Sequence, residues 1–104
     1  MLDKTYTIFL DKKFDRCIKN LPGDIKEVFD RKLNYFKENP SHPSLNTKPY
    51  SVSQKILRSL DVDQVYEFYI NRRDYRCIFY VRREEKEIII AYVGNHTQIK
   101  NRLS

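Results

Sequence analysis

Three short apolar runs near the C-terminus constrain the fold of this chain more than any other feature. They are rich in β-branched and aromatic residues, and only short charged linkers separate VYEFYI (65–70), YRCIFYV (75–81) and EIIIAYV (87–93). Runs of this composition with connections this short are typical of antiparallel hairpins. We therefore predict a three-stranded antiparallel meander over residues 65–93.

The N-terminal part of the chain carries a different period, which indicates helices. TYTIFL (5–10) has the composition of a first strand. Downstream of it, apolar residues recur at spacings of three and four from Phe14 to Leu21, and again from Ile25 to Phe36. This is the spacing of one helical face, and the Pro-Gly pair between the two stretches divides them. We predict two consecutive amphipathic helices.

The boundaries of the second helix and the segment after it follow from their polar residues and prolines. Asp24 is predicted to cap the helix, and Asn39-Pro40 to end it, because a residue before proline avoids helical dihedrals. Residues 40–64 carry three prolines and little periodicity. We expect a long crossing loop there, with a short helical turn near residues 53–60.

These elements together predict an α+β fold. Two N-terminal helices are expected to pack on one face of a small, mostly antiparallel four-stranded sheet. The chain has 104 residues, which fits one domain over residues 1–104 with one modest core. The C-terminal residues 98–104 are predicted to form only a frayed helical turn.

Alternation along the first hairpin decides which side chains share a face of the sheet. If Ile70 pairs with Tyr75, the apolar side chains point to one face, which the helices cover. The opposite face then carries Glu67, Tyr69 and Arg76. A slip of one residue would bury two unpaired charges at a cost of several kcal/mol, so this register is favoured. The three side chains are either a solvated cross-strand pair with a tyrosine beside it or part of a site.

His96 follows the last predicted strand directly, in the segment YVGNHTQ (92–98). A histidine there is either an ordinary turn residue or an imidazole presented to a ligand bound near Arg76. Histidine has an ordinary pKa of about 6.5 and therefore serves as an acid or a base near neutral pH. The residues alone leave both interpretations open.

Composition bounds the partners and the compartment. The formal net charge of +6 favours a polyanion such as RNA, DNA or an acidic protein. Cys17 and Cys77 are too few for a disulfide framework and lack the spacing of metal ligands, so we predict no metal site and no cofactor. No run is long and apolar enough to span a membrane, and Asp3 and Lys4 interrupt any signal peptide, so we expect a cytoplasmic protein.

Three longer segments, in this order, resemble the RelE/ParE superfamily of bacterial toxins. LPGDIKEVFDRKLNYFKENPSHPSL (21–45) is similar to that family's paired helices and the loop after them. VYEFYINRRDYRCIFYV (65–81) is similar to its strand–turn–"YR"–strand pattern, and IIIAYVGNHTQ (88–98) to its apolar strand followed by "VG-x-H" or "VG-x-R". The resemblance covers nearly the whole chain and implies two N-terminal helices on an antiparallel sheet.

The resemblance also implies a function. Members similar to RelE are endoribonucleases that enter the ribosomal A site and cut mRNA without a metal, by attack of a ribose 2′-OH on the adjacent phosphate. A cognate antitoxin inhibits them, and we expect an acidic one here. By position, Arg76 matches the arginine that stabilises the phosphate, and His96 matches the residue after "VG-x". Glu67 would act as the base or orient Arg76, and Lys48 would add positive charge.

Substrate contacts are predicted for Tyr69, Arg72, Arg73 and Lys100, the two arginines because they lie at a hairpin end. The chain also departs from the family pattern. No aromatic residue follows His96 closely, and Glu67 and Tyr69 stand where some members carry lysines. Three other positions for a base-stacking ring stay open, namely Tyr50, Tyr69 and Tyr80. Two other functions also stay open: a ParE-type inhibitor of DNA gyrase that is not an enzyme, and an inactive relative that only binds its antitoxin.

Overall fold

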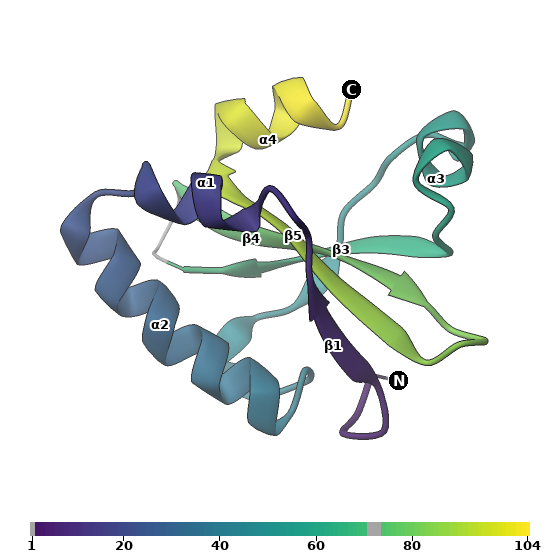
Figure 1. Cartoon of the computed structure of the whole chain (residues 1–104), viewed down its shortest axis with the longest axis horizontal. Coiled ribbons are helices and arrows are strands. Elements are labelled where there is room, and N and C mark those ends of the chain that lie inside the picture. Colours follow the sequence, from purple (N-terminus) through teal and green to yellow (C-terminus); the bar gives the residue numbers. More distant parts are fainter. Residues whose placement is uncertain (1, 71–73) are drawn as a thin grey trace.

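A computed structural model describes residues 2–70 and 74–104 of the chain. Helices and strands follow each other without a repeated unit (Figure 1). In chain order they are β1 (Thr7–Leu10), α1 (Phe14–Lys19), α2 (Gly23–Glu38), the 3₁₀ turn η1 (Pro43–Leu45), β2 (Lys48–Pro49), α3 (Gln54–Leu60), β3 (Gln64–Tyr69), β4 (Tyr75–Arg82), β5 (Glu87–Asn95) and α4 (His96–Arg102).

The sheet confirms the predicted α+β class but corrects the number of strands. It has five strands in the order β1-β5-β4-β3-β2, where four were predicted. The additional strand, β2, pairs only two residues with β3, which is too short to leave a period in the sequence. The sheet is mixed, because β1 pairs in parallel with β5 while the other neighbours are antiparallel. The two helices between β1 and the meander allow this parallel pairing.

The predicted register of the first hairpin is confirmed. Phe68 lies opposite Cys77, and Tyr69 lies opposite Arg76. The backbone N–H of Ile70 donates to the carbonyl oxygen of Tyr75 at 3.0 Å, which closes the ladder at the hairpin end. Glu67, Tyr69 and Arg76 therefore share the face that the sequence assigned to them.

The two faces of the sheet are covered by different helices, which corrects a second part of the prediction. On one face α1 and α2 pack an aromatic core that includes Phe29, Phe36, Phe68 and Phe79. On the other face a smaller apolar cluster lies under α4 and α3, and its buried members are Val65, Ile78, Tyr80, Ala91, Ile99 and Leu103. Figure 1 shows α2 on one side of the sheet and α3 on the other. We call the face under α3 and α4 the open face, because these short helices cover it only in part.

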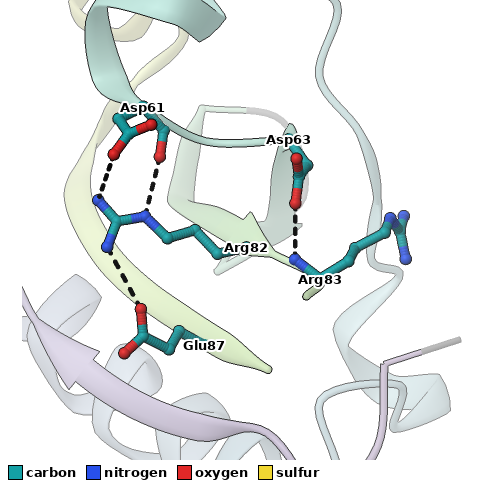
Figure 2. Close-up of polar contacts among 5 residues, drawn as sticks. All are labelled: Asp61, Asp63, Arg82, Arg83 and Glu87. Atoms are coloured by element: carbon teal, nitrogen blue, oxygen red, sulfur yellow. Dashed lines mark hydrogen bonds and ion pairs between the residues drawn. The ribbon is translucent and has the colours of Figure 1, made fainter. Parts of the chain in front are cut away.

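Arg82 and Arg83, in the β4–β5 hairpin, hold the end of α3 and the residues after it (Figure 2). The Nε of Arg82 donates to the carbonyl oxygen of Asp61 at 2.8 Å, and its Nη1 donates to the carboxylate of Glu87 at 3.3 Å. The backbone N–H of Arg83 donates to the Asp63 carboxylate at 2.7 Å. These contacts fix the segment that leads from α3 into β3.

The predicted end of α2 at Asn39-Pro40 is confirmed, because α2 ends at Glu38 with Asn39 as its C-cap, but its predicted start and the predicted C-terminal turn need correction. The residue that caps α2 is Pro22, and it makes no side-chain capping bond, so Asp24 does not begin the helix as predicted. The expected frayed turn at the C-terminus is a full helix, α4, capped by Asn95. In the described part of the chain, no helix is both long enough and apolar enough to cross a membrane.

Candidate functional site

Five side chains that the sequence singled out lie at one end of the open face. Lys48 comes from β2, Glu67 and Tyr69 from β3, Arg76 from β4, and His96 is the first residue of α4. We call these five residues the polar cluster. Lys48 and His96 are exposed, Tyr69 and Arg76 are half-buried, and Glu67 is buried. The cluster thus has an open side lined by cations and an imidazole.

The central contact of the polar cluster joins Arg76 to His96. The Nη1 of Arg76 lies 2.8 Å from the Nδ1 of His96. A guanidinium has only donors, so Nδ1 accepts this hydrogen bond, and a neutral ring carries its proton on Nε2. The arrangement therefore presents an exposed imidazole at the rim of the cluster.

Glu67 forms an ion pair with Arg76 on the buried side of the guanidinium. Its side chain is only 3% exposed, and its Oε1 lies 3.4 Å from the Nε of Arg76. Neither atom makes a hydrogen bond among the described residues, so this ion pair is what compensates their burial. A carboxylate that is buried beneath a guanidinium holds it in place but does not reach a ligand on the open side. The geometry therefore favours the orienting role for Glu67.

Lys48 and Tyr69 form the outer side of the polar cluster. The Nζ of Lys48 and the Cζ of Arg76 each lie 4.9 Å from the centre of the Tyr69 ring. A hydrogen bond with the Tyr69 side chain and the electrostatic interaction with it raise the pKa of Lys48 above its usual value. Lys48 therefore keeps its proton at neutral pH and acts as a cation. The Tyr69 ring already contacts two cations, a favourable arrangement for an aromatic face.

The start of α4 determines where His96 lies. The capping box that sets this start was not predicted from the sequence. Asn95 and Gln98 form a capping box in which the Asn95 side chain accepts from the Gln98 N–H, and the Gln98 side chain accepts from the Asn95 N–H. A Cβ on Gly94 would lie 2.8 Å from both Gln98 Oε1 and the Tyr92 ring, so a larger residue there would require these side chains to shift. The signal was present, because an Asn followed three residues later by a Gln is a helix-start pattern.

The remaining predicted residues lie outside the polar cluster. Lys100 is exposed on α4 one turn after His96, and it lines a groove instead. Arg72 and Arg73 fall outside the described residues. Among the residues that the structure describes, no three His, Cys, Asp or Glu side chains are grouped as ligands of a metal would be. A cavity of about 300 Å³ between α1 and α4 includes none of the predicted site residues among those described.

Several solved structures have the same fold at low sequence identity. A chain of a RelB–RelE antitoxin–toxin complex from Methanococcus jannaschii superimposes with a TM-score of 0.63 at 16% identity, over 92% of this chain and 99% of that one. An archaeal RelE–RelB complex from Pyrococcus horikoshii gives 0.61 at 17% identity, over 88% and 94%. The E. coli DinJ–YafQ toxin–antitoxin complex gives 0.61 at 15% identity, over 90% and 96%.

No family model matches the sequence, and no curated relative does. The likeness to solved structures extends over nearly the full length of both chains, as the sequence resemblance implied. The chain therefore has the RelE-like fold.

Proposed function

Starting from this RelE-like fold, we propose that the protein is the toxin of a type II toxin–antitoxin system and that it cuts mRNA on the ribosome. The observation that carries the proposal is the contact between Arg76 and His96 on the open side of the polar cluster. A guanidinium that can bind a phosphate, beside an accessible imidazole that can take a proton, suits cleavage of a phosphodiester by a neighbouring hydroxyl. The net charge of +6 suits a polyanionic substrate.

In the proposed reaction a phosphate of the RNA binds Arg76 and breaks its hydrogen bond to His96. The guanidinium binds the phosphate oxygens, and the Nδ1 of His96 becomes free to accept a proton. The ribose 2′-OH gives its proton to Nδ1 while its oxygen bonds to phosphorus, and the bond from phosphorus to the 5′-oxygen breaks. Lys48 donates a proton to that leaving oxygen. The products are a 2′,3′-cyclic phosphate and a 5′-OH. His96 has gained the proton of the 2′-OH, and Lys48 has given one to the 5′-oxygen.

The environments of the cluster residues support this division of roles. Lys48 has a raised pKa, so it keeps its proton at neutral pH and does not act as a base. His96 accepts a hydrogen bond from Arg76 and is exposed, which suits a base. Glu67 is buried against Arg76 and is a positioning residue in this scheme. The positive charges around the phosphate would stabilise the charge that develops in the transition state.

The partner in this proposal is an acidic antitoxin. The similar structures include toxin–antitoxin complexes. A chain of net charge +6 favours an anionic protein, and a disordered acidic segment that folds on binding would cover the cationic surface. The expected complex weakens as salt is raised, because charge attraction between exposed groups is screened. A complex with the protein encoded next to this one, titrated against salt, tests the partner.

The test of the enzyme proposal is induced expression followed by primer-extension mapping of cellular transcripts. We expect new mRNA ends with the wild type, and their loss with Arg76→Ala. Arg31→Ala is a matched control, because Arg31 is an exposed arginine on α2, on the other face of the sheet. Intact transcripts with the wild type, or equal cutting by Arg76→Ala, would refute the proposal. DNA damage with intact transcripts would point instead to inhibition of gyrase.

A further inference from the structure

A groove of about 740 Å³ lies on the open face between α3 and α4. Its walls are the segment after β2, one side of α3, and the C-terminal half of α4 with the residues that follow. The side chains that matter here are Tyr50, Val52, Ile56 and Leu103, which give it apolar walls, and Lys55 and Lys100, which lie at its rim. No Asp or Glu side chain is among the described residues that line it.

Two elements that contribute to the polar cluster, β2 and α4, continue into the walls of the groove. On one side, Tyr50 follows Lys48 by two residues, and its N–H donates to the carbonyl oxygen of Val65 at 2.8 Å, which continues the ladder of β2. Alternate residues of a strand point the same way, so the Cα of Tyr50 lies about 7 Å beyond that of Lys48 and the two side chains share a face. On the other side, Lys100 follows His96 by one helical turn, about 6 Å along α4.

The ring of Tyr50 is the one that remains for stacking among the three tyrosines that the sequence left open. Tyr80 is only 8% exposed beneath α3 and α4. The Tyr69 ring already contacts Lys48 and Arg76. Tyr50 is half-buried against the apolar cluster of the open face and lines the groove. A ring held by packing on one side and open on the other is a stacking platform for a base.

We propose that this groove is a subsite for an unpaired nucleobase of the substrate RNA, next to the phosphate that the polar cluster cuts. Tyr50 stacks on the base, and Lys55 and Lys100 contact the phosphates that flank it. The charge of the rim complements RNA, and Tyr50 and Lys100 in the groove lie two residues along the chain and one helical turn along α4 from members of the polar cluster. This inference rests on the proposed function and specifies how the enzyme would hold its substrate and prefer certain bases.

The experiment compares the time course and the position of transcript cuts between variants. Tyr50→Leu removes the aromatic ring and keeps an apolar side chain against the sheet. Loss of one stacked base is expected to slow cutting at preferred sites by roughly 10-fold to 100-fold and to weaken the base preference beside the cut. Tyr50→Phe keeps the ring and is expected to restore both the rate and the preference.

A second variant keeps the test independent of packing. Lys100 is exposed, so Lys100→Ala leaves the fold unchanged and is expected to reduce cutting and its dependence on salt. Lys26→Ala is the matched control, because Lys26 is an exposed lysine on α2, on the other face. Thermal unfolding of each variant confirms that it is folded.

The outcomes separate this inference from the proposed function. A wild type that cuts no RNA overturns both. A wild type that cuts RNA, with Tyr50→Leu cutting the same positions at the same rate, overturns the groove alone. If Tyr50→Leu and Lys100→Ala weaken only the antitoxin complex, the groove is a protein-docking surface and the inference is wrong. Equal loss in Tyr50→Leu and Tyr50→Phe also contradicts stacking.

Discussion

The two faces of the sheet differ in the side chains that they bury. On the face under α1 and α2, the Phe36 ring lies 5.3 Å from the Phe68 ring and 4.9 Å from the Phe79 ring, in a core without charged side chains among its described members. On the open face, Arg76 and Glu67 share the sheet with a smaller apolar cluster. Burial of charge costs free energy, which an aromatic core offsets. One face stabilises the fold, and the other is free to carry chemistry.

The largest expected effect is on activity and belongs to the open face. His96→Ala removes the proposed base and should lower the rate of RNA cleavage by about 100-fold to 10,000-fold. Because His96 is exposed, its loss should change the free energy of unfolding by less than about 0.5 kcal/mol. The measurement is a cleavage time course together with urea unfolding.

The other histidine is the matched control for this prediction. His42 stacks on Tyr35 with 4.6 Å between ring centres and accepts from the Ser44 N–H, away from the polar cluster. His42→Ala should leave the cleavage rate unchanged. Equal loss of activity in the two variants would remove the special role of His96.

The next effect is on stability and belongs to the aromatic face. Phe36 is fully buried, so Phe36→Ala should lower the free energy of unfolding by about 3–5 kcal/mol through lost burial and a cavity. Phe9→Ala is the control, since Phe9 on β1 is 45% exposed and should cost much less. Chemical unfolding of both variants measures the difference. Similar losses at the two positions would contradict the assignment of the core to this face.

A smaller effect on stability is expected at Glu67, a charged residue that is buried on the open face. Glu67→Gln keeps the shape of the side chain but leaves the buried Nε of Arg76 beside a neutral group. We expect a loss of about 1–3 kcal/mol in the free energy of unfolding, discounted because Arg76 keeps 16% of its side chain in solvent.

The cleavage rate of the same variant tests positioning. If Glu67 acts through Arg76, its loss should lower the rate less than Arg76→Ala does and should leave the pH profile unchanged in shape. Glu27→Gln, at an exposed position on α2, serves as the control. A change in the shape of the pH profile would instead assign a proton to Glu67.

The smallest effect is expected at the surface contacts that hold the end of α3 (Figure 2). Arg82 is one-third exposed and pairs with Asp61 and Glu87. Exposed ion pairs contribute little, so Arg82→Ala should cost at most about 1 kcal/mol in unfolding. Thermal unfolding at low and high salt checks this, with Arg31→Ala as the comparison. A loss near that of Phe36→Ala would mean that α3 carries part of the core.

The sequence predicted the parts of this structure that depend on local periodicity. The register of β3 against β4 follows from alternation, which places Glu67, Tyr69 and Arg76 on one face, as the structure has them. The helical periods of α1 and α2 were equally readable. The two-residue β2 was not, because Lys48 and Pro49 are too few to show a period, although Lys48 itself was singled out.

The contacts of the candidate site depended on features that periodicity does not report. The distance from Arg76 to His96 depends on where α4 begins, which the Asn95–Gln98 capping box decides. The burial of Glu67 beside Arg76 and the place of Tyr50 in the groove between α3 and α4 depend on packing between distant elements. These features depend on packing between elements that are far apart in the chain. The candidate residues can therefore be predicted from the sequence, but their exposure cannot.

The chemistry of the cut ends tests the central claim most directly, namely that Arg76 and His96 cleave RNA through a ribose hydroxyl. Attack by the 2′-oxygen predicts a 2′,3′-cyclic phosphate on one fragment and a 5′-hydroxyl on the other, produced by the wild type and lost in His96→Ala. Fragments that carry a 5′-phosphate, or RNA that stays intact with folded wild-type protein, would contradict the account.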